Sequence, residues 1–199
     1  IGLGLGMLAA VKHKRWLDHS AVMLAMIGIA IPSFIIAPLL VLIFAVNLNW
    51  LPAGGTGDSG FVLQYWIMPV IVLALPQIAV VTRLIRSSLL EVLSSPFIRT
   101  ARAKGLPERL VLLRHAIKPA LLPLVSYLGP AAAGIITGSV VVESVFGLPG
   151  LGSEFVTAAG NRDYTLTLGV VVFYGALLMG FNLVVDILYA WLDPKVRYS

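Results

Sequence analysis

Cysteine is absent from the 199 residues, and charged side chains are scarce, at 12% of the chain. Without cysteine the chain cannot form a disulfide, an iron–sulfur site or a thiolate nucleophile. Charged residues make up about 25% of an ordinary soluble domain, about twice their share here. Hydrophobic residues make up 59% of the sequence. The composition therefore excludes an ordinary soluble domain and indicates an integral membrane protein.

Several catalytic signatures are also missing. No Gly-x-x-x-x-Gly-Lys-Ser/Thr sequence occurs, so we expect any ATP hydrolysis to belong to another chain. His13, His19 and His115 lie far apart in or beside charged segments, without the spacing of a zinc site, so we expect them to be solvated. Because no histidine lies at membrane depth, the residues also disfavour an intramembrane hydrolase. We expect no enzyme, metal or cofactor in this chain.

Long apolar runs dominate the rest of the sequence. Four runs are long enough to cross a hydrocarbon core of about 30 Å: roughly Ala21 to Val46, Phe61 to Val81, Ala120 to Val142 and Leu166 to Leu192. The opening run, Ile1 to Val11, is too short to span alone, so we interpret it as the tail of a helix whose beginning lies upstream. The predicted fold is an all-α polytopic membrane protein with four full spans and part of another.

Basic residues are concentrated on one side of these spans. Eight of the fourteen lysines and arginines lie between Arg83 and Lys118, and only Arg162 falls outside the expected cytoplasmic segments. The positive-inside rule therefore assigns the 83–118 loop to the cytoplasm. The same rule explains the net charge of +5 without a nucleic-acid partner.

The third run contains a pair of small residues, Gly134 and Gly138, that permits close helix packing. Two interpretations stay open: a pore or subunit interface, or packing within the subunit. Prolines within the runs predict kinked helices.

The basic loop carries signals for a short helix. Ser95 suits an N-cap, Pro96 suits the first helical position, and Gly105 suits a left-handed helix end. These signals predict a helix over Pro96–Lys104, with Phe97, Ala101 and Lys104 on one face, and with Ala101 and Ala103 small enough to let a partner approach closely. A second helix is expected from Pro107 toward Lys118. The alternative is an amphipathic segment lying on the anionic inner leaflet.

The segment Phe97-Ile-Arg-Thr-Ala-Arg-Ala-Lys-Gly105, followed by Arg114-His-Ala-Ile-Lys-Pro-Ala-Leu-Leu-Pro123, resembles the cytoplasmic signature of ABC importer permeases. It is most similar to the first permease subunit of dipeptide and oligopeptide importers. The general motif places Glu-Ala-Ala before the glycine, but Arg99, Thr100 and Ala101 stand there. Its Ile-x-Leu-Pro end is also altered, with proline one place later at Pro119. Both departures are usual in the peptide branch.

The resemblance covers essentially the whole chain. It includes Ile31-Pro-Ser-Phe34, Trp50-Leu-Pro52, Val145-Phe-Gly-Leu-Pro-Gly-Leu-Gly152, Arg162-Asp-Tyr164, Val185-Asp-x-x-Tyr189 and Asp193-Pro194. It implies one transmembrane domain of the type I importer class, residues 1–199, which matches the C-terminal two thirds of a six-helix subunit in the prokaryotic cytoplasmic membrane. The 83–118 loop would contact the ATPase subunits through these residues: Phe97, Ile98, Arg99, Thr100, Ala101, Arg102, Ala103, Lys104 and Gly105.

The resemblance also implies the partners and the cargo. The expected partners are a homologous second permease, two ABC ATPase subunits that bind ATP and Mg, an extracytoplasmic solute-binding protein and the lipid bilayer. The expected cargo is oligopeptides or dipeptides, carried by alternating access driven by ATP. Nickel, glutathione or sugars are the alternative cargo, and a passive channel is the alternative mechanism.

Two further groups of residues are candidates for function. The outer-side residues Glu143, Glu154, Arg162 and Asp163 are candidate contacts to a binding protein. Asn182, Asp186 and Tyr189 share one face of the last span, with Asp193 beyond them. An ionisable group inside a span is a functional candidate because its burial is costly. For this face we favour a hydrogen-bonded seam between helices over a contact to solute.

Overall fold

The computed structural model describes residues 1–57 and 62–192, and within these ranges its regular secondary structure is helical throughout. The predicted all-α class is confirmed. The first half contains α1 (Gly2–Val11), α2 (Trp16–Ala30), α3 (Ser33–Leu40), the π-helix η1 (Val41–Asn47) and α4 (Leu63–Leu93). The second half contains α5 (Pro96–Ala103), α6 (Glu108–Leu110), the π-helix η2 (Val111–Ala116), α7 (Ile117–Ala120), α8 (Leu122–Ile136), α9 (Val140–Phe146), α10 (Leu151–Gly160) and α11 (Tyr164–Leu192).

Three helical stretches among the described residues are long and apolar enough to cross a membrane: Leu63–Ser94, Leu122–Phe146 and Tyr164–Leu192. Trp16–Ala30 and Ser33–Asn47 together form a fourth candidate, but they are bent by 94° relative to each other. The run predicted from Ala21 to Val46 is therefore broken. Ile31 has an extended backbone at this break, because a residue before proline is disfavoured in the helical region. Pro32, which precedes α3, is extended as well.

Helices α1 and α2 pack against the 31-residue helix α4 through glycines. A Cβ added to Gly28 of α2 would lie 2.4 Å from the carbonyl oxygen of Leu75, and one added to Gly6 of α1 would lie 2.7 Å from that of Thr82. The Thr82 hydroxyl also donates a hydrogen bond to the Gly2 carbonyl oxygen, at 3.2 Å. Only a residue without a side chain permits such close backbone approach.

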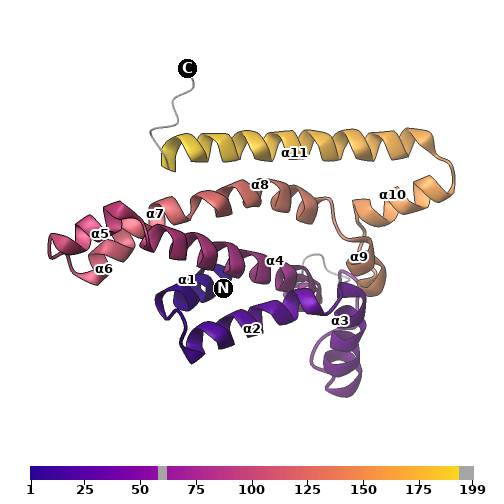
Figure 1. The fold of residues 1–199 in the computed structure, drawn as a ribbon. Helices are drawn as coiled ribbons and strands as arrows, with labels where there is room; N and C mark the ends of the chain where they lie inside the picture. The colour runs from indigo at the N-terminus through magenta and orange to yellow at the C-terminus, as the bar shows by residue number, and fades with distance from the viewer. Residues whose placement is uncertain (58–61, 193–199) are drawn as a thin grey trace.

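The two ends of the molecule are built differently (Figure 1). The α1–α2 turn, α5 and α6 lie toward one end, whereas α3, α9 and α10 lie toward the other. One buried cluster supports the first end and includes Ala10, Leu89, Ile98, Ala101 and Val111. A second cluster, with Met68 and Phe146 among its members, supports the other end.

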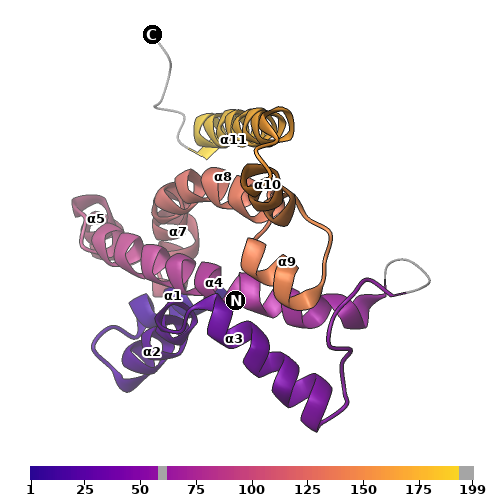
Figure 2. The same cartoon turned by 90° about the vertical axis from the view of Figure 1, so that its right-hand side faces the viewer.

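Helix α11 packs along α8 and is otherwise largely exposed, as the end-on view in Figure 2 shows. One close approach is at Gly129 of α8, where an added Cβ would lie 2.9 Å from a methyl group of Val185. Gly134, which the sequence offered as a packing residue, has no neighbouring atom within 4 Å of such a Cβ. The packing glycine of this helix pair is therefore Gly129, and Gly134 lies on an open surface of the described chain.

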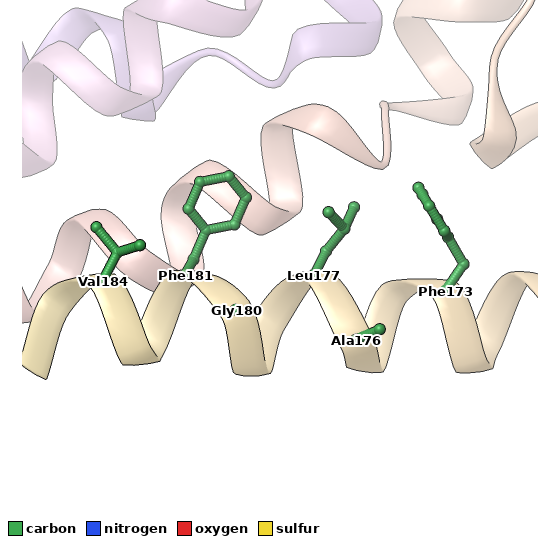
Figure 3. A pocket seen from close by; sticks show the side chains of 6 residues that line it. All are labelled: Phe173, Ala176, Leu177, Gly180, Phe181 and Val184. Atoms are coloured by element: carbon green, nitrogen blue, oxygen red, sulfur yellow. The ribbon is translucent and has the colours of Figure 1, made fainter.

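A shallow apolar hollow of about 300 Å³ lies along α11. Figure 3 shows that Phe173, Leu177, Phe181 and Val184 project from the same side of this helix, and Phe173 and Val184 are about half exposed. The six lining residues come from one helix and carry no polar side-chain atom. Such a surface suits lipid or another apolar helix and has no group that would recognise a polar solute.

The close contact at Gly28 generates a stability prediction. We expect Gly28→Ala to lower the free energy of unfolding by about 1–3 kcal/mol, because the new methyl group meets the backbone of α4. Gly4→Ala is the matched control, since a Cβ at Gly4 meets nothing within 4 Å. Thermal unfolding in detergent, followed by tryptophan fluorescence, compares the two variants. Equal melting temperatures would show that this contact does not limit packing.

Candidate functional site

The helix of the basic loop begins shortly after α4 ends. Helix α4 continues to Leu93, well past the apolar run predicted to end at Val81, and α5 follows after two serines. Ser95 has the extended backbone of an N-cap and Pro96 begins the helix, as predicted. The Ser95 hydroxyl, however, donates to the Val92 carbonyl oxygen at 2.6 Å, so it closes the end of α4 instead of capping α5.

Gly105 ends this helical segment in the predicted conformation. Its φ angle is +75°, and its N–H donates to the Arg102 carbonyl oxygen at 2.9 Å. Helix α5 itself ends at Ala103, one residue earlier than expected. The second predicted helix is present as a continuous helical run of α6, η2 and α7, which begins at Glu108.

One face of α5 packs against its own chain. Ile98 is fully buried and Ala101 is 8% exposed, and both belong to the cluster that contains Leu89 of α4 and Val111 of η2. The sequence argument, which used the small size of Ala101 to let a partner approach, is corrected here. The small side chain instead allows α5 to lie close to the chain beneath it.

The opposite face of α5 is open. Phe97, a large apolar residue four positions before Ala101, is 50% exposed and lies at the edge between the buried and the open face. The other exposed residues of the segment are Arg99, Thr100, Arg102, Ala103, Lys104 and Gly105. The face therefore combines one aromatic side chain with basic and small residues on a helix whose other side is fixed.

An ion pair joins the end of α5 to α6. Arg102 donates to both carboxylate oxygens of Glu108, from Nη2 at 2.6 Å and from Nε at 3.1 Å. These hydrogen bonds lower the pKa of Glu108 below its ordinary value. Because the folded pKa is lowered, any stabilisation is present at neutral pH and is lost as the pH falls through the carboxyl range. Both side chains are well exposed, so the contribution is small.

Glu143 was expected to contact a partner on the outer side, and the structure corrects this expectation. The side chain is 6% exposed. Its carboxylate accepts hydrogen bonds from the backbone N–H groups of Ser153, at 2.6 Å, and Gly152, at 3.4 Å. These N–H groups lie in the first turn of α10, where a carboxylate is favourable. Glu143 therefore links α9 to α10.

The other three outer candidates are exposed: Arg162 and Asp163 lie in the α10–α11 turn, and Glu154 lies near the start of α10. Asp163 accepts a hydrogen bond from the Leu166 N–H at 3.0 Å and so caps the start of α11. Arg162 has a left-handed backbone with φ of +59°. Glu154, in the first turn of α10, is free at the surface for a contact to another molecule. These residues stay candidate contacts.

The predicted polar seam on α11 is divided between two environments. Tyr189 donates a hydrogen bond to the Leu122 carbonyl oxygen at 3.0 Å and also contacts the Ser126 hydroxyl. The amide oxygen of Asn182 lies beside Gly129. Asp186 is exposed, and Asp193 lies outside the described residues. The packing role is thus visible at Tyr189, while the role of Asp186 stays a prediction.

The sequence argument missed Asp18, which is only 1% exposed. Arg86 of α4 donates to both of its carboxylate oxygens, from Nε at 2.6 Å and from Nη2 at 2.9 Å. The Lys14 N–H also donates to it at 3.0 Å, and Nδ1 of His13 lies 3.2 Å away. His13 was expected to be solvated; its side chain is 40% exposed, and it also contacts Asp18. The sequence did carry a signal for this pair: Asp18 is the one acid beside the basic residues 12–15, and Arg86 follows the apolar run that ends at Val81.

These features define a multi-pass membrane protein with a helix-bearing basic loop at one end of its bundle. A family model described as the binding-protein-dependent transport system inner membrane component matches residues 2–198. The chain belongs to this family and is a component of the inner membrane.

Individual relatives carry more specific names. The oligopeptide transport system permease protein OppB of Escherichia coli (strain K12) is 54% identical over 198 residues, which cover 100% of this chain and 64% of that protein. OppB of Haemophilus influenzae is 52% identical over 199 residues, with the same two coverages. The dipeptide transport system permease protein DppB of Bacillus subtilis is 42% identical over 196 residues, covering 98% of this chain and 62% of that protein. The chain thus spans just under two thirds of the length of these relatives.

Alanine-to-aspartate substitutions at two positions distinguish the buried face of α5 from its exposed face. We expect Ala101→Asp to destabilise the loop by several kcal/mol, because it places a charge in the buried cluster. Ala103→Asp, on the exposed side of the same helix, should change stability by no more than about 0.5 kcal/mol. Melting temperatures of the two variants in detergent are the measurement. Equal destabilisation would contradict the assignment of the inner face.

The Glu143 contact predicts a local effect on α10. We expect Glu143→Ala to lower the free energy of local opening at the Gly152 and Ser153 amides by about 1–3 kcal/mol, because both lose their acceptor. Hydrogen exchange measured by mass spectrometry reports this change. Glu154→Ala, an exposed acid in the same turn, is the control and should leave exchange at these amides unaltered.

Proposed function

We propose that the chain is part of a transmembrane permease subunit of an ATP-driven ABC importer that takes up oligopeptides or dipeptides. The observation that carries this proposal is the geometry of α5. It follows directly on a spanning helix, one face is fixed in a buried cluster, and the other face is presented outward. The printed names of the relatives, which are permease proteins of oligopeptide and dipeptide transport systems, supply the cargo.

The proposed partners follow from the same features. The exposed face of α5 would contact an ATPase subunit and move when that subunit changes conformation. A complete transporter would have two ATPase subunits. A homologous second permease would complete the pathway, and a solute-binding protein would dock on the outer end near Glu154, Arg162 and Asp163. ATP and Mg would be held by the ATPase subunits, and the permease would make no covalent bond.

The proposed mechanism is alternating access. ATP binding would bring the ATPase subunits together and displace α5. Because Ile98 and Ala101 pack in the cluster that contains Leu89 of α4, displacement of α5 moves the end of a spanning helix as well. Interfaces between packed elements tend to switch between discrete arrangements, which turns a small shift at the loop into a change in the pathway. The pathway would reopen inward after hydrolysis.

The test is ATP hydrolysis by the full-length permease, reconstituted with its second permease, its ATPase subunits and its binding protein. We expect short peptides to stimulate hydrolysis, because transported solute promotes the closed state through the binding protein. Stimulation only by nickel, glutathione or sugars would support the ABC importer proposal but contradict peptides as its substrate. Failure of any ATPase subunit to associate would overturn the importer proposal in favour of a channel.

The same preparation tests the open face of α5. We expect Phe97→Ala to weaken association with the ATPase subunits by about 1 kcal/mol or more, since an exposed aromatic residue on a docking helix is a typical interface anchor. Leu113→Ala, an exposed apolar residue on η2, is the matched control. Equal affinity of both variants would remove Phe97 from the interface.

A further inference from the structure

Asp18 and Arg86 form a buried contact at the cytoplasmic end of the bundle that the proposed transport mechanism has not used. Asp18 lies in the first turn of α2 and Arg86 in the last third of α4. Both carboxylate oxygens accept from the guanidinium, and the Lys14 N–H donates to one of them. The carboxylate is 1% exposed and the arginine 28% exposed. This is a bidentate, charge-assisted pair whose acid is almost completely shielded from water.

The pair joins parts of the chain that would otherwise meet only through apolar packing. Nearer the outer end, α2 meets α4 at Gly28 and Leu75. Apolar contact of this kind is not directional, so it leaves helices free to slide or rotate by small amounts. A bidentate pair fixes both the distance and the register of two helices. Together the two contacts, one near each end of α2, hold this helix against α4 along its length.

Arg86 also lies one turn before the residue that supports α5. Leu89, three residues further along α4, is in the buried cluster that contains Ile98 and Ala101 of α5 and Ala10 of α1. The cluster therefore ties α5 to α4 and α1, and the ion pair ties α2 to the same part of α4. Helix α5 is thus connected to α2 through two neighbouring residues of α4: Leu89 contacts α5, and Arg86 binds Asp18.

We propose that Asp18 and Arg86 are positioning residues that make α2 move with α4 and α5 as one rigid unit when an ATPase subunit displaces α5. This inference rests on the proposed function of the permease. In it the pair stays closed throughout the transport cycle, and neither residue contacts the solute. Without the pair, α4 and α5 would follow the ATPase subunits while α2 lagged behind. Hydrolysis would then continue with less transport.

The first test is a double-mutant cycle in the full-length permease assembled with its partners, read as solute transported per ATP hydrolysed. We expect Asp18→Asn and Arg86→Gln each to lower this ratio by about fivefold or more, which is the usual lower range of coupling between sites. The double variant, Asp18→Asn with Arg86→Gln, is decisive. It leaves no unpaired buried charge, so a purely structural pair would recover wild-type coupling in the double variant. Our inference requires the ratio to stay low.

Thr82→Val is the matched control. Thr82 is also buried on α4, and its hydroxyl joins α4 to α1 through the Gly2 carbonyl oxygen. Its removal costs a buried polar contact between helices but leaves α2 attached. We expect Thr82→Val to retain the wild-type transport ratio, whatever its effect on melting temperature. A loss of coupling equal to that of the double variant would show that any weakened helix contact uncouples the machine, and it would overturn the inference.

A second test asks whether the pair stays closed. This sequence contains no cysteine, so Asp18→Cys with Arg86→Cys introduces the one thiol pair within it. We expect the uncrosslinked variant to be uncoupled, and a short bismaleimide linking the two thiols to restore transport per ATP toward the wild-type value. Transport that stays blocked after linking would show that the contact must open during the cycle. In both tests the wild-type protein is measured first. If solute does not stimulate its ATP hydrolysis, the proposed function is refuted; if only the variants behave against expectation, the inference about the ion pair is refuted.

Discussion

The close approach of α1 and α2 to the backbone of α4 is the contact from which the rest of the arrangement follows. Within a bilayer the surrounding chains are as apolar as the side chains, so helices associate through van der Waals contact and interhelical hydrogen bonds. Gly6 and Gly28 bring neighbouring backbones to distances that no Cβ would allow. Because α4 is held in this way, the loop that leaves its end is held as well, and α5 receives a fixed base.

Two buried acids organise the two ends of the molecule by the same chemistry. At one end Asp18 accepts from the Lys14 N–H and from Arg86. At the other end Glu143 accepts from two N–H groups in the first turn of α10. A buried carboxylate is costly unless hydrogen bonds compensate it, so both side chains specify one arrangement of the elements around them. The carboxylates fix the ends, and apolar packing fixes the middle.

Much of the fold could be predicted because its signals are local. The apolar runs gave the candidate spanning helices, and the combination of Pro96 with Gly105 gave the short helix of the loop. The orientation inferred from lysine and arginine stays a prediction. The break at Pro32 is also local, although the sequence suggested only a kink and not a bend of 94°. The family resemblance on the loop motif was confirmed by the match over residues 2–198.

What the sequence left open or missed has a different cause. Gly134 and Gly129 are equally small, and only the position of α11 decides that Gly129 is the packing residue. Ala101 and Ala103 lie on one short helix, and only the cluster beneath α5 decides which of them is buried. Glu143 was expected to contact a binding protein, and Asp18 was not singled out. Their burial depends on groups supplied by other segments.

The sequence by itself determined the membrane class, most of the helical segments and the short helix of the loop, because hydrophobicity and backbone preference act over a few neighbouring residues. Only the tertiary structure decided which side of each helix is buried and which acid meets which base. Helices of similar apolar character can pack on several faces at nearly equal cost, so the choice depends on backbone approach and on pairs such as Asp18 with Arg86 that are distant in sequence.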